Sequence, residues 1–159
     1  MIKIITGLFF LLTSSLLAQE QTVGFKLNDS TTLSFTTKPF DPSHKKFQYY
    51  DETHPYSIDG KPIFGTDANM PKHELVKAIL QINETEYNLQ VDTMYDPGIE
   101  KENMHRFKII KTGPMLSLKA RFSDGAGGYL AEWVIIIGGK SIRTMLTNDE
   151  LAYSYFADY

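Results

Sequence analysis

One proline-rich segment, residues 38–74, contains three of the four histidines of the 159-residue chain together with several carboxylates. Imidazole and carboxylate groups can act together as acid and base in hydrolysis, or can bind a metal ion. The groups of this segment that could serve in a small hydrolase are His54, His73, Asp59 and Asp67.

The metal-binding motifs of known spacing are incomplete. His73 and Glu74 begin like the helix of a zinc protease, but Lys77 occupies the position where the second histidine is required. No other pair of histidines has the spacing of ligands on a helix, and the chain has no cysteine thiolate. The sequence therefore predicts no metal site and no cofactor.

The motifs of nucleophilic catalysis and nucleotide binding are also incomplete. Ser123-Asp124 lacks the flanking glycines of a nucleophile elbow. The following glycines, at residues 125–127, resemble a dinucleotide loop, but Leu130 stands where the third glycine belongs. The absence of a complete motif favours a non-catalytic binding or interaction module. The hydrolase stays as the alternative, because catalytic groups can converge from distant loops without leaving a sequence pattern.

Aromatic side chains suggest where such a module binds a protein or a carbohydrate. Trp133 shares its parity with neighbouring apolar residues and is predicted to lie in the core. Tyrosines of the proline-rich segment are better candidates for an exposed platform, because tyrosine combines a large contact area with a polar tip. The predicted ligand-binding set is Tyr49, Tyr50, His54, Tyr56, Asp59, Asp67 and His73.

A second group of carboxylates lies between Asp92 and Glu102. Its spacing matches no calcium-loop template, and Asp96-Pro97-Gly98 is a turn signature. We interpret this segment as a solvated acidic loop.

Residues 59–67, Asp-Gly-Lys-Pro-Ile-Phe-Gly-Thr-Asp, are followed by Pro71, by Ser-Asp-Gly-Ala-Gly at residues 123–127, and by Glu132-Trp133. In these motifs the chain resembles small exported bacterial proteins of uncharacterised function. The resemblance covers residues 57–150. It implies that the loop and the turn form a structural unit, and it implies no activity.

The first eighteen residues are typical of a secretory signal peptide. Lys3 precedes a fourteen-residue apolar stretch, Ile4 to Leu17, and Ala18 is followed by polar residues. The stretch is shorter than the roughly twenty residues that a membrane-spanning helix needs. We therefore expect residues 1–18 to be removed and residues 19–159 to form one exported domain, without a transmembrane helix.

The composition indicates in which compartment the protein works and which partners are not expected. The chain contains no cysteine, and an exported protein without disulfides fits a bacterial periplasm or the external medium. Removal of Lys3 with the leader changes the net charge from −3 to −4. A mildly acidic protein lacks the overall basic character that nucleic acid binding requires, so nucleic acid is not an expected partner.

Alternating apolar and polar residues predict the strands that must position these groups. Hairpins are expected with turns at Asp29-Ser30, Asn83-Glu84 and Gly138-Gly139, and Val76, Ala78, Leu80 and Ile82 are expected to share a buried face. Residues 107–122 give two more strands, and residues 129–137 are apolar enough to be the central one. The expected fold is an all-β antiparallel β-sandwich.

Two segments depart from this alternation. Residues 38–74 contain five prolines, so they are predicted to form an ordered excursion with an edge strand near Phe47 to Tyr50. After Thr147 the apolar residues recur at helical spacing, and Thr147 with Glu150 matches a capping box. A short C-terminal helix is therefore expected.

Overall fold

The computed structural model describes residues 19–148, and these residues form antiparallel strands joined by turns and two short 3₁₀ helices. This confirms the predicted all-β class. The predicted leader and the predicted C-terminal helix, beyond Asn148, lie outside the described residues. Within residues 19–148, no helix combines the length and apolar character needed to cross a membrane.

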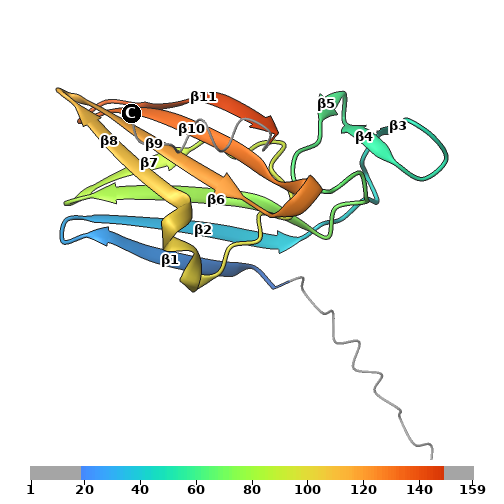
Figure 1. Ribbon diagram of the computed structural model, residues 1–159, viewed down its shortest axis with the longest axis horizontal. Coiled ribbons are helices and arrows are strands. Elements are labelled where there is room, and N and C mark those ends of the chain that lie inside the picture. Colours follow the sequence, from blue (N-terminus) through green and yellow to red (C-terminus); the bar gives the residue numbers. More distant parts are fainter. Residues whose placement is uncertain (1–18, 149–159) are drawn as a thin grey trace, which may run out of the picture.

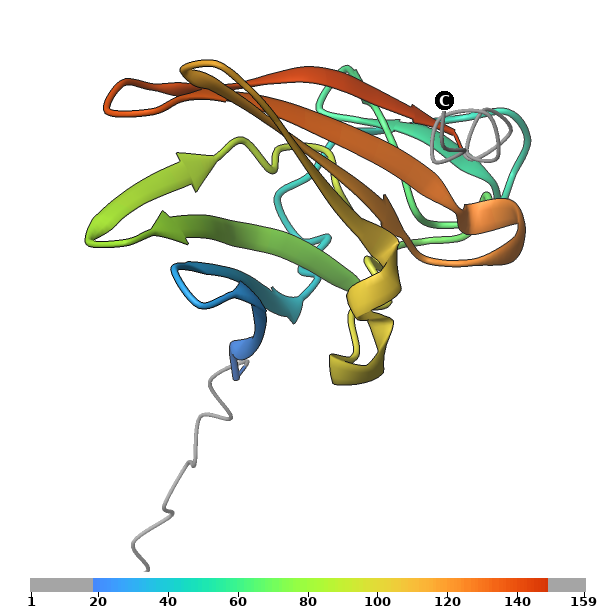
Figure 2. The same cartoon turned by 60° about the vertical axis from the view of Figure 1, so that its left-hand side comes forward.

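Two four-stranded sheets form the body of the protein, in the orders β1-β2-β6-β7 and β11-β10-β9-β8. Figures 1 and 2 show these sheets as two layers, one above the other. The first sheet contains β1 (Gln21–Asn28), β2 (Thr31–Pro39), β6 (His73–Ile82) and β7 (Thr85–Leu89). The second contains β8 (Phe107–Thr112), β9 (Met115–Phe122), β10 (Tyr129–Ile136) and β11 (Ser141–Asn148). The 3₁₀ helices are η1 (Lys101–Arg106) and η2 (Gly125–Gly127).

The core lies between the two sheets because each strand directs alternate side chains inward. Leu33 and Phe35 of the first sheet and Trp133 and Phe122 of the second belong to one buried cluster. Trp133 is fully buried, as predicted, and its indole N–H donates a hydrogen bond of 2.9 Å to the carbonyl oxygen of Gln90. Full burial of each large apolar side chain contributes about 1.5–3 kcal/mol.

The predicted inward face of β6 is wrong at one position. Thr36 is paired with Lys77 whereas Thr37 is paired with Leu75, so Val76 occupies a β-bulge. A bulge inserts one extra residue and reverses the alternation beyond it. As a result Leu75, rather than Val76, is buried in the core with Ala78.

The excursion forms a small sheet of its own, in the order β3-β4-β5. Its strands are β3 (Phe47–Tyr49), β4 (Pro55–Ile58) and β5 (Lys61–Pro62), and Figure 1 shows them at one end of the molecule, opposite the hairpin turns. The strand predicted near Phe47 is therefore confirmed, while the second and third strands were not predicted.

The prediction for β10 is confirmed, whereas β11 extends further than predicted. β10 lies between β9 and β11, which confirms that residues 129–137 include a central strand. β11 continues to Asn148, past the expected helix cap at Thr147, because Thr147 is paired with Leu130 in the sheet.

Candidate functional site

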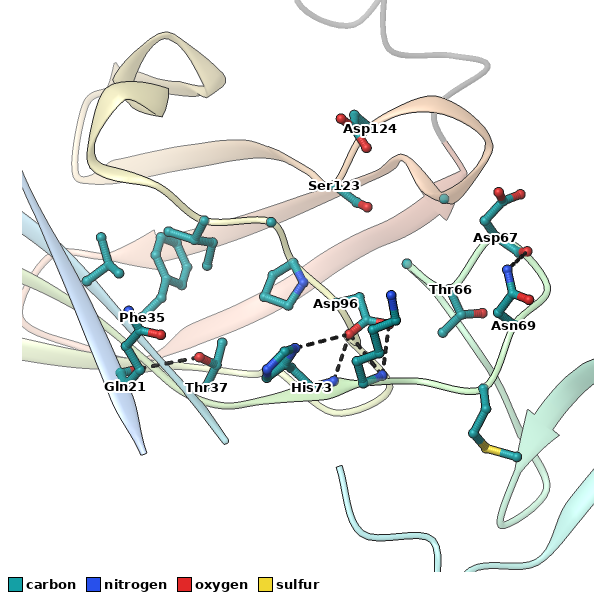
Figure 3. A pocket seen from close by; sticks show the side chains of 18 residues that line it. Gln21, Phe35, Thr37, Thr66, Asp67, Asn69, His73, Asp96, Ser123 and Asp124 are labelled. Atoms are coloured by element: carbon teal, nitrogen blue, oxygen red, sulfur yellow. Dashed lines mark hydrogen bonds and ion pairs between the residues drawn. The ribbon is translucent and has the colours of Figure 1, made fainter. Parts of the chain in front are cut away.

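A pocket of about 840 Å³ opens where the excursion meets the ends of both sheets. Segments far apart in the sequence line it, including the start of β1, residues 65–73, residues 96–99 and residues 123–127. Figure 3 shows Ser123 and Asp124 on one side of the pocket and His73 and Asp96 on the facing side. Ligand pockets in proteins commonly have volumes of roughly 300–1,000 Å³.

Asp96 holds in place the pocket wall that is formed at the start of β6. Its carboxylate accepts the backbone N–H of Lys72 at 3.1 Å and that of His73 at 2.7 Å. The His73 Nδ1 atom lies 3.6 Å from the same carboxylate. The interpretation of residues 92–102 as a solvated loop is therefore wrong at Asp96. Its position in an Asp-Pro-Gly turn was the available signal, since such side chains accept backbone N–H groups.

Glycines allow the two loops of the opposite wall to approach each other. A Cβ atom on Gly127 would lie 3.2 Å from the backbone nitrogen of Asp67 and 3.2 Å from the carbonyl oxygen of Gly65. Contacts this tight are rare for a Cβ atom, so a side chain at residue 127 would require the facing backbone to shift by a few tenths of an ångström. The close approach brings Asp67 to the same pocket as Ser123 and Asp124.

Three of the seven non-glycine residues with positive φ in the described range line the pocket. Asp67, Asp96 and Ser123 have φ values of 47°, 37° and 57°, in the left-handed region that non-glycine residues rarely adopt. All three line the pocket. Such conformations cost about 1–3 kcal/mol each and tend to occur at functional sites, where they aim side chains or backbone groups at a ligand.

The pocket combines hydrogen-bond acceptors with an apolar wall. The exposed carboxylates of Asp67 and Asp124 make no hydrogen bond or ion pair with any other residue in the described range. Val23, Phe35 and Ile99 supply the apolar wall. The arrangement can accept hydrogen bonds from hydroxyl or amine groups while an apolar part of the ligand packs below them.

The pocket also contains a serine, a histidine and an aspartate, which are the residue types of a catalytic triad. His73 faces Asp96, as described above, but within residues 19–148 no hydrogen bond joins Ser123 to His73. The contact between nucleophile and base that defines such a mechanism is therefore not formed in this structure. The other histidine proposed for catalysis, His54, is not among the residues lining the pocket.

The tyrosine platform lies on the small sheet, apart from the pocket. The rings of Tyr50 and Tyr56 are 4.7 Å apart, and Tyr50 is 79% exposed. Beside them, His54 Nδ1 lies 2.7 Å from the Asp51 carboxylate. Hydrogen bonds from the backbone of Thr53, and from His54, hold the pKa of Asp51 well below its usual value.

The predicted ligand-binding set is thus divided between two places. Asp67 and His73 line the pocket. The other five belong to the small sheet and its turns, namely Tyr49, Tyr50, His54, Tyr56 and Asp59. Asp59 accepts the backbone N–H of Lys46 at 3.0 Å and borders a second, smaller cavity of about 220 Å³.

The residues that sequence reasoning did not select for the site are Asp96, Ser123 and Asp124. Ser123 and Asp124 were considered only as parts of a catalytic motif, and no local pattern placed them opposite residues 65–73. Across residues 19–148, no group of three or more histidine and carboxylate side chains is placed to hold a metal ion. Comparisons with protein-family models, curated proteins and solved structures find no match for this chain.

Proposed function

We propose that this protein is a non-catalytic binding module of the bacterial cell envelope, exported after removal of residues 1–18. In this proposal a β-sandwich presents the pocket at the end that carries the excursion. The ligand is a small polar molecule or the exposed end of a larger one, such as a carbohydrate, with hydroxyl or amine groups and an apolar face. The observation that carries the proposal is the pocket of about 840 Å³ with two unpaired carboxylates, Asp67 and Asp124.

The cost of the pocket supports a binding role. A chain selected only for stability gains nothing from three strained backbone positions around one cavity, each of which costs about 1–3 kcal/mol. Asp96 holds one wall through hydrogen bonds from the backbone of Lys72 and His73, so this wall is fixed by the fold itself. A preformed site loses less conformational entropy on binding than one that must be ordered.

The same geometry favours binding over hydrolysis. A hydrolase of this kind requires a base in contact with its nucleophile or with a positioned water molecule. His73 is directed at Asp96, and His54 and Asp59 are engaged by Asp51 and by Lys46 elsewhere in the fold. The fourth candidate, Asp67, lines the pocket, but no histidine within residues 19–148 is hydrogen-bonded to its carboxylate.

The exported form, freed of its leader, is the material for testing the proposal. A soluble array of mono- and oligosaccharides, amino sugars and short peptides is screened against the protein, and affinities of the hits are measured by calorimetry. Asp67→Asn and Asp124→Asn remove the proposed acceptors' charge and are each expected to weaken binding about tenfold, as expected for loss of a charge-assisted hydrogen bond.

The matched control is Glu84→Gln, which removes one negative charge in the exposed turn between β6 and β7. It is expected to leave binding unchanged. Equal affinity of all three variants for every hit would place the ligand elsewhere and refute the proposal. Turnover of a hit by the wild-type protein, lost in His73→Gln, would establish the hydrolase instead.

A further inference from the structure

The pocket is lined by charged groups of both signs, and the groups without a partner lie on two facing walls. Asp67 and Asp124 belong to the loops that meet at Gly127, and their carboxylates have no hydrogen bond or ion pair with any residue between 19 and 148. Asp96 faces Asp124 across the pocket (Figure 3). Lys72 lines the pocket from the wall of Asp96, to which its backbone N–H donates at 3.1 Å. The Lys72 ammonium group has no ion pair in the same range of residues.

The other two titratable residues that line the pocket, Asp96 and His73, are engaged within the wall itself. Asp96 accepts hydrogen bonds from the backbone N–H groups of Lys72 and His73. The His73 Nδ1 atom lies 3.6 Å from the same carboxylate. The charges that remain for a ligand are therefore two negative groups, at Asp67 and Asp124, and one positive group, at Lys72.

A ligand that complements these charges carries two positive groups and one negative group. A neutral sugar offers an ion pair to none of the three residues. A diamine leaves Lys72 without an anionic partner, and an acidic ligand brings its negative charges close to Asp67 and Asp124, where like charges repel. A basic amino acid carries the required set, namely two cationic groups and a carboxylate, and each can form a charge-assisted hydrogen bond.

The apolar wall of the pocket accommodates the rest of such a ligand. It is formed by Val23, Phe35 and Ile99. Figure 3 shows Phe35 on the side of the pocket away from Asp67, so the charged and the apolar parts of the ligand occupy different ends. The volume of about 840 Å³ exceeds that of one amino acid and leaves room for a second residue. A basic residue followed by an apolar residue fills both ends.

We propose that the ligand of the pocket is a basic amino acid, either free or as the first residue of a short peptide. The inference rests on the proposed function, since it names the ligand class of the same pocket. The two cationic groups pair with Asp67 and Asp124, and the carboxylate pairs with Lys72. The methylene groups, or in a peptide the following side chain, pack toward Phe35 and Ile99.

Calorimetric titration of the exported protein with five small compounds tests which charges the pocket recognises. The compounds are lysyl-leucine, L-lysine, cadaverine, norleucine and L-glutamate. Cadaverine is lysine without its carboxylate, and norleucine is lysine without its side-chain ammonium group. Each of these two is expected to bind about tenfold more weakly than L-lysine, because one charge-assisted hydrogen bond is lost. L-glutamate is expected to bind most weakly of the five.

Lys72→Gln removes the ammonium group and keeps the backbone N–H that donates to Asp96. It is expected to lower the affinity for L-lysine about tenfold, and not to lower the affinity for cadaverine, which has no carboxylate to pair. The matched control is Lys77→Gln, at an exposed position of β6 that does not line the pocket. It is expected to bind both compounds as the wild type does. Unchanged circular dichroism and melting temperature establish that both variants are folded.

The two sources of the ligand are distinguished by the first two compounds. Tighter binding of lysyl-leucine than of L-lysine supports the peptide, because the following side chain then occupies the apolar end of the pocket. Tighter binding of L-lysine supports the free amino acid.

Two results would overturn this inference and leave the proposed function standing. The first is equal affinity for L-lysine, cadaverine and norleucine, or an equal loss for L-lysine and cadaverine in Lys72→Gln. The second is a neutral sugar whose binding Asp67→Asn and Asp124→Asn weaken, while L-lysine and lysyl-leucine do not bind. Binding of L-lysine that none of these three variants weakens would place the ligand outside the pocket and overturn both proposals.

Discussion

Replacing Gly65 with alanine would place a methyl group 1.9 Å from the carbonyl oxygen of Tyr95 and 2.7 Å from the ring of Tyr129. Neither neighbour can move easily, because the first is a backbone atom and Tyr129 is fully buried. Forced overpacking of this kind costs about 1–3 kcal/mol. Gly65 also has a φ of 103°, which adds about 1–3 kcal/mol for a residue with a side chain. The expected loss in free energy of unfolding is about 4 kcal/mol.

Gly113→Ala is the matched control for the backbone component alone. Gly113 has a φ of 58°, and a Cβ atom there would meet nothing within 4 Å. The expected loss is about 1–2 kcal/mol, which is the strain of one left-handed residue. The two glycines therefore separate the steric cost from the conformational cost.

Urea denaturation followed by the fluorescence of the single tryptophan, Trp133, measures both variants. Trp133 is buried in the core, so its emission reports unfolding of the two main sheets. Equal m-values would establish that the change in midpoint reflects stability. If Gly65→Ala lost no more stability than Gly113→Ala, the close packing of residue 65 against Tyr95 and Tyr129 would be refuted.

Three further predictions concern buried aromatic groups. The Tyr129 hydroxyl is buried without a hydrogen-bond partner in the described residues. Tyr129→Phe should therefore raise the free energy of unfolding, measured by urea titration, by about 1 kcal/mol. A decrease in the free energy of unfolding would show that the hydroxyl has a partner. Trp133→Phe removes the hydrogen bond to Gln90 and leaves a cavity, so it should lower the thermal midpoint and the free energy of unfolding, the latter by about 2–3 kcal/mol. An unchanged midpoint would contradict this. Burial raises the pKa of Tyr95 to about 12, above its ordinary 10.0. The contribution of the neutral phenol to the free energy of unfolding is therefore complete below pH 10 and is lost as the pH rises through 12. Tyr95→Phe should therefore flatten the fall in stability between pH 10 and 12, measured by denaturation at each pH, and an unchanged slope would contradict the raised pKa.

The strands of the two main sheets could be predicted because alternation carries the information locally. In β9 the buried residues Leu118 and Ala120 are flanked by polar neighbours that face outward. The turn at Asn83 is marked by a residue that adopts positive φ readily. The error at Val76 has the same origin. A single inserted residue reverses the alternation, and no local signal marked the bulge.

The site was less predictable because it depends on contacts between distant segments. Asp96 bonds to the backbone of Lys72 and His73, 24 and 23 residues away, and Gly127 packs on Gly65. A carboxylate that caps a remote strand has the same sequence signature as a solvated one. The sequence therefore indicated the segment that contains part of the pocket, while the tertiary fold determines which of its residues converge.

The small sheet illustrates a further limit. β5 has two residues, one of them Pro62, and its pairing with β4 follows from the turn at Asp59, where φ is 53°. A two-residue strand is too short to show alternation, so its existence depends on the turn before it.

The most direct test of the proposed function is to map the ligand identified by the array onto the protein by chemical-shift perturbation of the backbone amides. The proposed pocket predicts that the largest changes occur at residues 65–69, 96–99 and 123–127, and that they saturate with the affinity measured by calorimetry. Changes confined to Tyr49, Tyr50 and Tyr56 would contradict it and place the binding site on the small sheet.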